Sequence, residues 1–303
     1  MKSKFLIILS ACAALASGLL IVNAQEPDDD VRGAFLSSRP KNTNPNATRR
    51  HRPPRKPNNS TSSSATTNTN AGKTYTSNTN NAANKIGSGA GAPLQAIGLG
   101  YTLFMRAPNG GGVRVEPDHE FYKGDRVRLA LEPNIDGYLY VFHAEGDGQP
   151  EMIYPDWRLD AGENWIEAHV PIEVPSSQQA DERFHWFVFD ANPATEHLYV
   201  VVTREPLSVV PTGGDLVKLC SANKEKCPWR PSTETFSSVQ VATKAEVKIV
   251  TSKTFGQAQT DKEKISTTRG LGLDSSAPEP AVIRLNAAPT APILVAVVDL
   301  IHR

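Results

Sequence analysis

Several acidic side chains in turn-like segments of this 303-residue sequence have a type and spacing that could suit catalysis. A glycosidase needs two carboxyl groups about 5–10 Å apart beside the bond that it hydrolyses. Carboxylates in the same segments would also suit calcium, but the regular ligand spacing of a known calcium loop is missing. We therefore predict no catalytic or metal site and keep an envelope hydrolase acting through Asp147 and Asp156 as the alternative. The acidic candidates are Glu145, Asp147, Asp156, Asp160 and Glu163.

The residue types of nucleophilic catalysis occur without the neighbours that this chemistry needs. A nucleophile must lie within hydrogen-bond reach of a base, and the sequence has no G-x-S-x-G motif. His143, His185 and His197 fall in or beside apolar segments typical of central strands, which favours packed histidines. An H-E-x-x-H motif is also absent. We predict that the chain is not an enzyme and requires no cofactor.

One aromatic segment suits ligand binding. Tyr154 and Trp157 lie close together in a loop-rich stretch with Asp156 and Arg158, and Trp165 follows. Exposed aromatic rings stack on carbohydrates or anchor a protein partner. The alternative is that these rings cover one end of the hydrophobic core. We name Tyr154, Trp157 and Trp165 as candidate ligand-binding residues.

The N-terminal residues 1–24 have the pattern of a secretory signal peptide. Lys2 and Lys4 precede an apolar stretch over 5–22, and Val22 and Ala24 are small residues at the −3 and −1 positions of a cleavage site. Cleavage after Ala24 predicts a periplasmic or extracellular protein with no transmembrane segment in its mature form. The alternative is lipidation of Cys12, which ends a Leu-Ser-Ala-Cys sequence.

Cleavage would leave two cysteines, Cys220 and Cys227, in the mature chain. An even pair in an exported protein predicts a disulfide. A metal site is disfavoured, because no nearby histidine or further cysteine completes a tetrahedral set of ligands. The short loop predicts a stabilisation of about 2–3 kcal/mol.

Residues 25–95 are rich in Asn, Thr, Ser and Pro and are predicted to form a disordered linker. Up to position 94 they contain ten Lys/Arg against four Asp/Glu, whereas residues 95–210 contain eight against nineteen, a net charge of −11. The basic cluster at 49–56 could contact anionic surfaces, at about 1 kcal/mol per residue. It contains no aromatic residue to stack on bases, so we predict no specific nucleic-acid partner.

Residues 96–210 are predicted to form an all-β sandwich. Val127, Leu129 and Leu131 alternate with polar residues, as in a half-buried strand. Further strands are predicted over 101–106, 138–143, 151–154, 166–174, 184–189 and 197–203, with Gly-, Asp- or Pro-containing turns between them. Residues 211–303 are predicted to be an extension with the disulfide loop and a closing hairpin of segments 281–285 and 293–301.

Four motifs within residues 99–207 occur in a recognisable order. They are Tyr122-Lys-Gly-Asp125, Asp136-Gly-Tyr-Leu-Tyr-Val-Phe142, Met152-Ile-Tyr-Pro155 and Thr195-Glu-His-Leu-Tyr-Val-Val-Val-Thr-Arg-Glu-Pro-Leu207. On these motifs the stretch resembles a bacterial family, domain of unknown function 4384. The resemblance implies an exported, immunoglobulin-like antiparallel β-sandwich without established catalytic residues.

These features together predict an exported, non-catalytic binding module of the bacterial cell envelope. Its expected partner is an envelope protein or glycan of unknown identity. A structural accessory of an envelope assembly is a further alternative beside the hydrolase.

Overall fold

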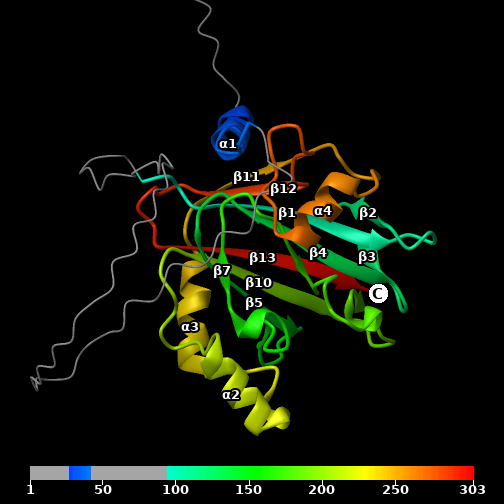
Figure 1. Cartoon of the computed structure of the whole chain (residues 1–303), viewed down its shortest axis with the longest axis vertical. Helices are drawn as coiled ribbons and strands as arrows, with labels where there is room; N and C mark the ends of the chain where they lie inside the picture. Colours follow the sequence, from blue (N-terminus) through cyan, green and yellow to red (C-terminus); the bar gives the residue numbers. More distant parts are fainter. Residues whose placement is uncertain (1–26, 42–93) are drawn as a thin grey trace, which may run out of the picture.

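The computed structural model of the chain describes residues 27–41 and 94–303. Two largely antiparallel β-sheets pack face to face, with helices on their outer faces (Figure 1). The prediction of an all-β sandwich is confirmed. The predicted signal peptide at 1–24 lies outside the described residues, as do residues 42–93 of the predicted linker. Within the described part of the chain, no helix is long and apolar enough to cross a membrane.

Sheet A has the strand order β11–β12–β1–β4–β8, with β2 beside β1 and β9 beside β4. Its strands are β1 (Gly98–Arg106), β2 (Gly112–Val115), β4 (Arg126–Pro133), β8 (Ile172–Val174), β9 (Phe187–Val188), β11 (Val247–Thr251) and β12 (Val282–Asn286). β8 therefore forms one edge of this sheet.

Sheet B has the order β3–β13–β10–β5–β6, with β7 beside β5. Its strands are β3 (Glu120–Phe121), β5 (Gly137–Glu145), β6 (Glu151–Tyr154), β7 (Trp165–Ile166), β10 (Thr195–Thr203) and β13 (Ile293–His302). All pairs in both sheets are antiparallel except β3 with β13, which is parallel. β6 forms one edge of sheet B, on the same side of the sandwich as the β8 edge of sheet A.

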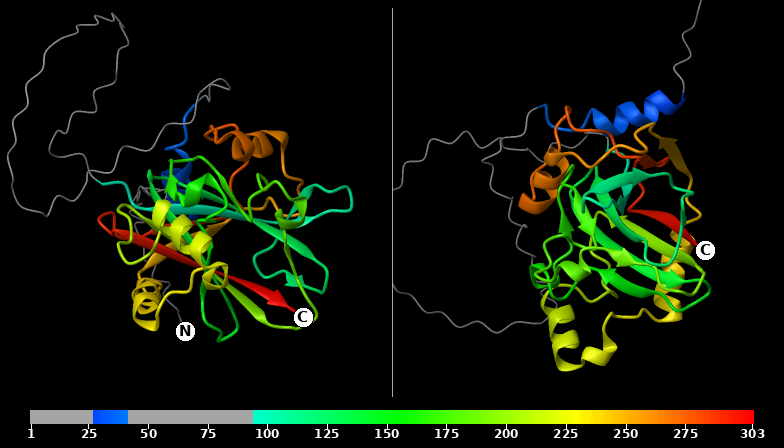
Figure 2. Two further views of the ribbon diagram at one scale, coloured as in Figure 1. Left: turned by 60° about the horizontal axis from the view of Figure 1, so that its bottom comes forward. Right: turned by 90° about the vertical axis from the view of Figure 1, so that its right-hand side faces the viewer.

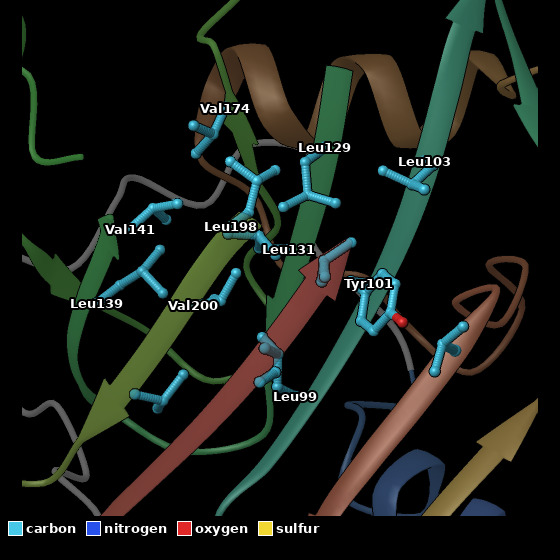
Figure 3. Close-up of a cluster of buried hydrophobic side chains, with 14 of the residues drawn as sticks. Leu99, Tyr101, Leu103, Leu129, Leu131, Leu139, Val141, Val174, Leu198 and Val200 are labelled. Carbon is cyan, nitrogen blue, oxygen red and sulfur yellow. The ribbon is translucent and has the colours of Figure 1, made fainter. Parts of the chain in front are cut away.

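The core lies between the sheets because alternate side chains of each strand point inward. Leu129 and Leu131 of β4 face Leu198 and Val200 of β10 across the sandwich, and all four are almost fully buried (Figure 3). The opposite faces of the same strands carry other residues, such as the buried Glu132 of β4. The alternation that predicted these strands thus also separates the core from the outer faces.

The prediction of a closing C-terminal hairpin is wrong. β12 pairs with β1 and β11 in sheet A, whereas β13 lies between β10 and β3 in sheet B. Leu294, Ala296 and Val298 of β13 are buried in the central core. The sandwich therefore continues beyond residue 210, because its two sheets are each completed by one C-terminal strand.

Two predicted strands are shorter than their apolar patterns suggested. The stretch 166–174 leaves sheet B after β7 and enters sheet A at β8, and His169 between them has a φ of 59°, which a strand does not allow. The stretch 184–189 begins in a short 3₁₀ helix, Glu182–Phe184, and contributes only β9. Both departures put loop residues at the edge of the sandwich near β8.

Among the described residues, four α-helices cover the outer faces of the two sheets. Helices α2 (Gly214–Ala222) and α3 (Thr233–Ala242) lie on sheet B, while α1 (Pro27–Leu36) and α4 (Asp261–Arg269) lie on sheet A (Figure 2). Helix α4 begins with a capping box, in which the Thr260 hydroxyl accepts from the Glu263 N–H and the Glu263 carboxylate accepts from the Thr260 N–H. Glu263 also pairs with the buried Arg114 of β2, which fixes the helix to the sheet.

The prediction of disorder is wrong for residues 27–41, which we call the N-terminal arm. Val31 and Phe35, four positions apart in α1, lie on one face of the helix. They pack against Val250 of β11 and Ile283 of β12. The place of Phe35 depends on Gly100 of β1, where an added Cβ would lie 3.1 Å from the phenyl ring and 2.3 Å from Pro280.

A buried ion pair anchors the end of the arm. Arg39 donates through Nε and Nη2 to the two carboxylate oxygens of Glu132, at 2.7 and 2.6 Å. It also donates to the carbonyl oxygens of Ala277 and Pro278. Since its guanidinium and the Glu132 carboxylate are both almost inaccessible to water, the arm is an integral part of the domain.

Candidate functional site

The candidate site is a pocket of about 470 Å³ at the open side of the sandwich, where β6 and β8 form the two sheet edges. Its volume falls within the usual range of ligand sites, about 300–1,000 Å³. Three of the four tryptophans of the chain line it. The aromatic and proline residues of the wall are Tyr154, Pro155, Trp157, Pro171, Pro175, Phe184, Trp186, Phe187, Pro228 and Trp229.

The three predicted ligand-binding residues do not lie together. Tyr154 ends β6, and Trp157 follows in the loop, so both line the pocket. Trp165 lies on β7 and is not part of the wall. Its ring packs edge-on against Tyr138, with 5.3 Å between the ring centroids, beneath the helices that cover sheet B.

Asp156 shapes the loop that carries Trp157. Its carboxylate accepts hydrogen bonds from the Arg158 backbone N–H at 2.9 Å, from Arg158 Nε at 2.9 Å and Nη2 at 2.7 Å, and from Gln179 Nε2 at 2.7 Å. The side-chain bond to Asp156 raises the pKa of Arg158. The Arg158 guanidinium in turn lies 5.4 Å from the centroid of the Phe184 ring. Asp156 is therefore occupied in holding the pocket wall.

The carboxylates of the hydrolase alternative do not form a pair. Asp147 lies in the turn before β6, and Asp156 follows the other end of this strand. At about 3.3 Å per residue, the four residues of β6 place the two groups more than about 10 Å apart. Only Asp156 lines the pocket. Within the described residues, no group of three or more His, Cys, Asp or Glu side chains is placed to hold a metal ion.

The sheet A wall of the pocket contains a buried charged cluster. The Arg128 guanidinium lies 4.3 Å from the centroid of the Trp186 ring and 3.4 Å from Glu173 Oε2. Gln259 donates to Glu173 Oε1 at 2.9 Å. Burial lowers the pKa of Arg128, and the charge of Glu173 opposes that shift. Trp186 is thus held between the pocket and a fixed guanidinium.

The disulfide loop supplies the opposite wall. Cys220, in α2, is bonded to Cys227, which confirms the predicted disulfide. The Met152 N–H of β6 donates to the Trp229 carbonyl oxygen at 2.8 Å, so Trp229 lies along the edge of sheet B. Gly213, just before α2, donates to the Gly162 carbonyl oxygen at 2.6 Å. These bonds attach the loop to the sandwich on both sides.

Removing the disulfide should therefore weaken both the fold and the pocket wall. Replacing Cys220 and Cys227 together with alanine should lower the free energy of unfolding by about 2–3 kcal/mol, because the unfolded chain regains loop entropy. Urea unfolding measures this change, and the reduced wild-type protein should give a matching curve. An unchanged midpoint in both samples would rule out the stabilising role.

The histidines predicted to pack in or beside strands each have a local partner. His143 Nε2 lies 2.6 Å from Glu196 Oε2, and His197 Nδ1 lies 2.7 Å from Asp299 Oδ1. His185 Nε2 lies 2.7 Å from the Gln179 carbonyl oxygen. These contacts fix strand ends and the loop behind Phe184.

A further histidine lies between a serine and a carboxylate. His169 Nε2 is 2.7 Å from Ser38 Oγ, and His169 Nδ1 is 2.8 Å from Glu132 Oε1. The order matches a nucleophile–base–acid triad. However, Ser38 follows the C-terminal end of α1, which presents carbonyl groups rather than the N–H donors that an oxyanion requires. Because Glu132 is also paired with Arg39, we assign this cluster to anchoring the arm.

Sequence reasoning missed Trp186 and Trp229 as pocket residues. Trp186 falls within the predicted strand 184–189, and Trp229 follows the disulfide loop more than seventy positions after Trp157. The position of Trp229 beside the cysteine pair was the available signal, since a disulfide loop next to an aromatic residue fixes that residue in place. The strand edge that Trp229 contacts depends on pairing between residues that are far apart in the sequence.

One segment of the chain matches a known protein family. Residues 120–206 match the model of the family described as Domain of unknown function (DUF4384), which confirms the resemblance for this segment. It supplies Tyr154, Trp157 and Trp186, whereas Trp229 lies outside it. No curated protein and no solved structure matches the chain.

Proposed function

We propose that the chain is an exported, non-catalytic binding module of the bacterial cell envelope, and that the aromatic pocket is its recognition site for an envelope protein or glycan. The observation that carries the proposal is the convergence of Trp157, Trp186 and Trp229 from three separate segments on one pocket.

The exposure of the rings supports recognition over a purely structural role. Trp157 and Trp229 are only half-buried, so part of each ring faces the pocket. Tryptophan is among the residue types that most often dominate the binding energy of an interface. Their positions are held by the β6 edge, the Asp156–Arg158 pair and the disulfide, and a rigid site loses less entropy on binding.

Export is supported by two sequence features. The pattern over residues 1–24 is that of a signal peptide, and disulfides persist in oxidising compartments. Fractionating the source cells tests this part of the proposal. The mature protein should begin at Gln25 and occur outside the cytoplasm, and a cytoplasmic chain that retains residues 1–24 would contradict it.

Capture from native envelope extract tests the recognition site. The mature protein, Gln25–Arg303, should retain an envelope protein or glycan, and Trp157→Ala should lose most of it. Trp165→Ala is the matched control, because it removes a half-buried tryptophan outside the pocket. Equal retention by both variants would refute the pocket as the recognition site.

A further inference from the structure

We propose that the pocket binds an extended peptide segment of its partner, which pairs with β8 at Glu173 and packs apolar side chains against the aromatic wall. This inference rests on the proposed function, because it chooses a protein over a glycan as the partner of the same site. Residues 170–179, which include all of β8, line the pocket. Within the described residues, β4 is the only strand that pairs with β8.

The backbone bonds of β4 on its β8 side come from odd-numbered residues. Phe189, which follows β9, donates its N–H to the Asp125 carbonyl oxygen at 3.1 Å. His169, in the loop before β8, donates its N–H to the Pro133 carbonyl oxygen at 2.7 Å. In an antiparallel sheet, alternate residues of a strand direct their N–H and C=O groups to opposite sides. Odd-numbered residues of β4 therefore bond toward β8, and even-numbered residues bond toward β1.

This register gives Glu173 outward-facing backbone groups. Leu129 of β4 is paired with Val174, and Leu131 is paired with Ile172. Since Leu129 and Leu131 are odd-numbered, Val174 and Ile172 use their N–H and C=O groups within the sheet. Glu173 lies between them, so its N–H and C=O point away from β4. One donor and one acceptor thus lie at the sheet edge, where an added strand forms its bonds.

Two prolines limit the edge to this single residue. Pro171 and Pro175 are the next positions with the same orientation, and proline has no N–H. An edge flanked by prolines does not recruit a long strand, which protects the sheet from edge-to-edge association. One ligand residue, which we call X, can still exchange two bonds with Glu173, as in a hydrogen-bonded antiparallel pair.

The Glu173 side chain adds a requirement for X. Its Oε2 is buried and accepts no hydrogen bond within the described residues, although Arg128 Nη1 lies 3.4 Å away. Leaving a buried acceptor unsatisfied is costly. Side chains of paired residues lie on the same face of a sheet, so a hydroxyl group on X is placed to donate to Oε2. We therefore expect serine or threonine at X.

The residues on either side of X meet the aromatic wall. Their side chains point to the other face of the added strand, as Ile172 and Val174 of β8 do. That face is the space between the two sheet edges, where Trp157 and Trp229 line the pocket. Apolar side chains before and after X would bury surface against these rings. Backbone bonds at an edge with pockets for alternate side chains are the usual combination in peptide recognition by strand addition.

The amide side chains of the pocket favour a peptide over a saccharide. A sugar is recognised by polar side chains that exchange hydrogen bonds with its hydroxyl groups. Here Gln179 donates to Asp156 at 2.7 Å, and Gln178 donates to the Thr267 carbonyl oxygen at 2.8 Å. Both side chains are engaged within the protein. Pairing with a strand edge uses backbone groups instead.

A neutral heptapeptide tests the pairing. The acetylated and amidated probe Gly-Ser-Leu-Thr-Leu-Ser-Gly has threonine at X between two leucines. It is titrated into the oxidised, ¹⁵N-labelled mature protein by calorimetry and NMR. It should bind saturably and slow the exchange of the Glu173 amide proton. A methyl group on the amide nitrogen of the central threonine should weaken binding about tenfold, because it removes one hydrogen bond to Glu173.

Three comparisons complete this experiment. The same methyl group on the following leucine is the matched control and should change affinity little, since that N–H points away from β8. Valine in place of the central threonine should weaken binding severalfold, because it removes the donor to Oε2. Trp229→Ala should weaken binding about tenfold or more, whereas Trp165→Ala should leave it unchanged.

Each contrary outcome separates this inference from the proposed function. Absence of probe binding, or equal affinity of the two methylated probes, overturns the pairing at Glu173. Equal affinity of the threonine and valine probes overturns the role of Oε2. Saturable binding of N-acetylglucosamine that depends on Trp229, with no binding of the probe, overturns the peptide class and leaves the pocket as a recognition site. If Trp157→Ala also leaves capture from envelope extract intact, the proposed function fails as well.

Discussion

Replacing Arg39 with alanine should lower the free energy of unfolding by about 3–5 kcal/mol, the usual cost of removing one partner from a buried ion pair. The Arg39 guanidinium makes two bonds to Glu132 and two to backbone carbonyl oxygens, in a site nearly closed to water. Its loss leaves the Glu132 carboxylate buried in that site, beside His169. Urea unfolding of the mature protein measures the change.

Arg32 provides the matched control. Its guanidinium pairs with Glu279 at 2.9 Å, but the side chain is about one-third exposed, at 31%. Exposed pairs contribute about 0–1 kcal/mol, so Arg32→Ala should shift the unfolding midpoint little. A loss for Arg39→Ala that equals the loss for Arg32→Ala would show that the arm is not anchored by its buried pair.

Replacing Trp157 and Trp229 together with alanine should weaken binding of the captured envelope component at least about 30-fold. Hot-spot residues cost 2 kcal/mol or more on truncation, and 2 kcal/mol corresponds to about that factor. Because both rings line one pocket, the two losses should not simply add. Calorimetric titration of the single and double variants gives the coupling between them.

Trp165→Ala again serves as the comparison for this effect. Thermal unfolding of each variant confirms that the protein being titrated is folded. If the affinity of the double variant were within threefold of that of Trp165→Ala, the rings of Trp157 and Trp229 would not be part of the recognition surface.

The strands that the sequence predicted well are those whose pattern is local. Val127, Leu129 and Leu131 alternate with polar neighbours within one strand, and this spacing alone assigns them to the core face. The disulfide was also predictable, because Cys220 and Cys227 are the two cysteines that remain when the predicted signal peptide is removed.

The N-terminal arm could not be predicted in the same way. Helix α1 has a short apolar face, and the arm is held in place by its contacts with Gly100, Glu132 and Ile283. Those residues lie on three strands that are far apart in the sequence. The composition of residues 25–95 as a whole indicates disorder. An average over this range does not reveal that one short segment, residues 27–41, packs on the sandwich.

The candidate site was predictable only in part for a related reason. Tyr154 and Trp157 are close in sequence, so their shared loop was evident. The pocket also requires Trp229, which reaches β6 through the disulfide loop, and Trp186, which comes from the sheet A side. Trp165 resembles the others in type, but its strand position directs it to the helices on sheet B.

Hydrogen–deuterium exchange of the mature protein, with and without the captured envelope component, tests the central claim most directly. The account predicts slower amide exchange at residues 151–160 and 224–230, which form two walls of the pocket, and unchanged exchange at α1 and β11. Protection confined to the arm, to β11 or to the helices on sheet B would contradict the pocket as the recognition site.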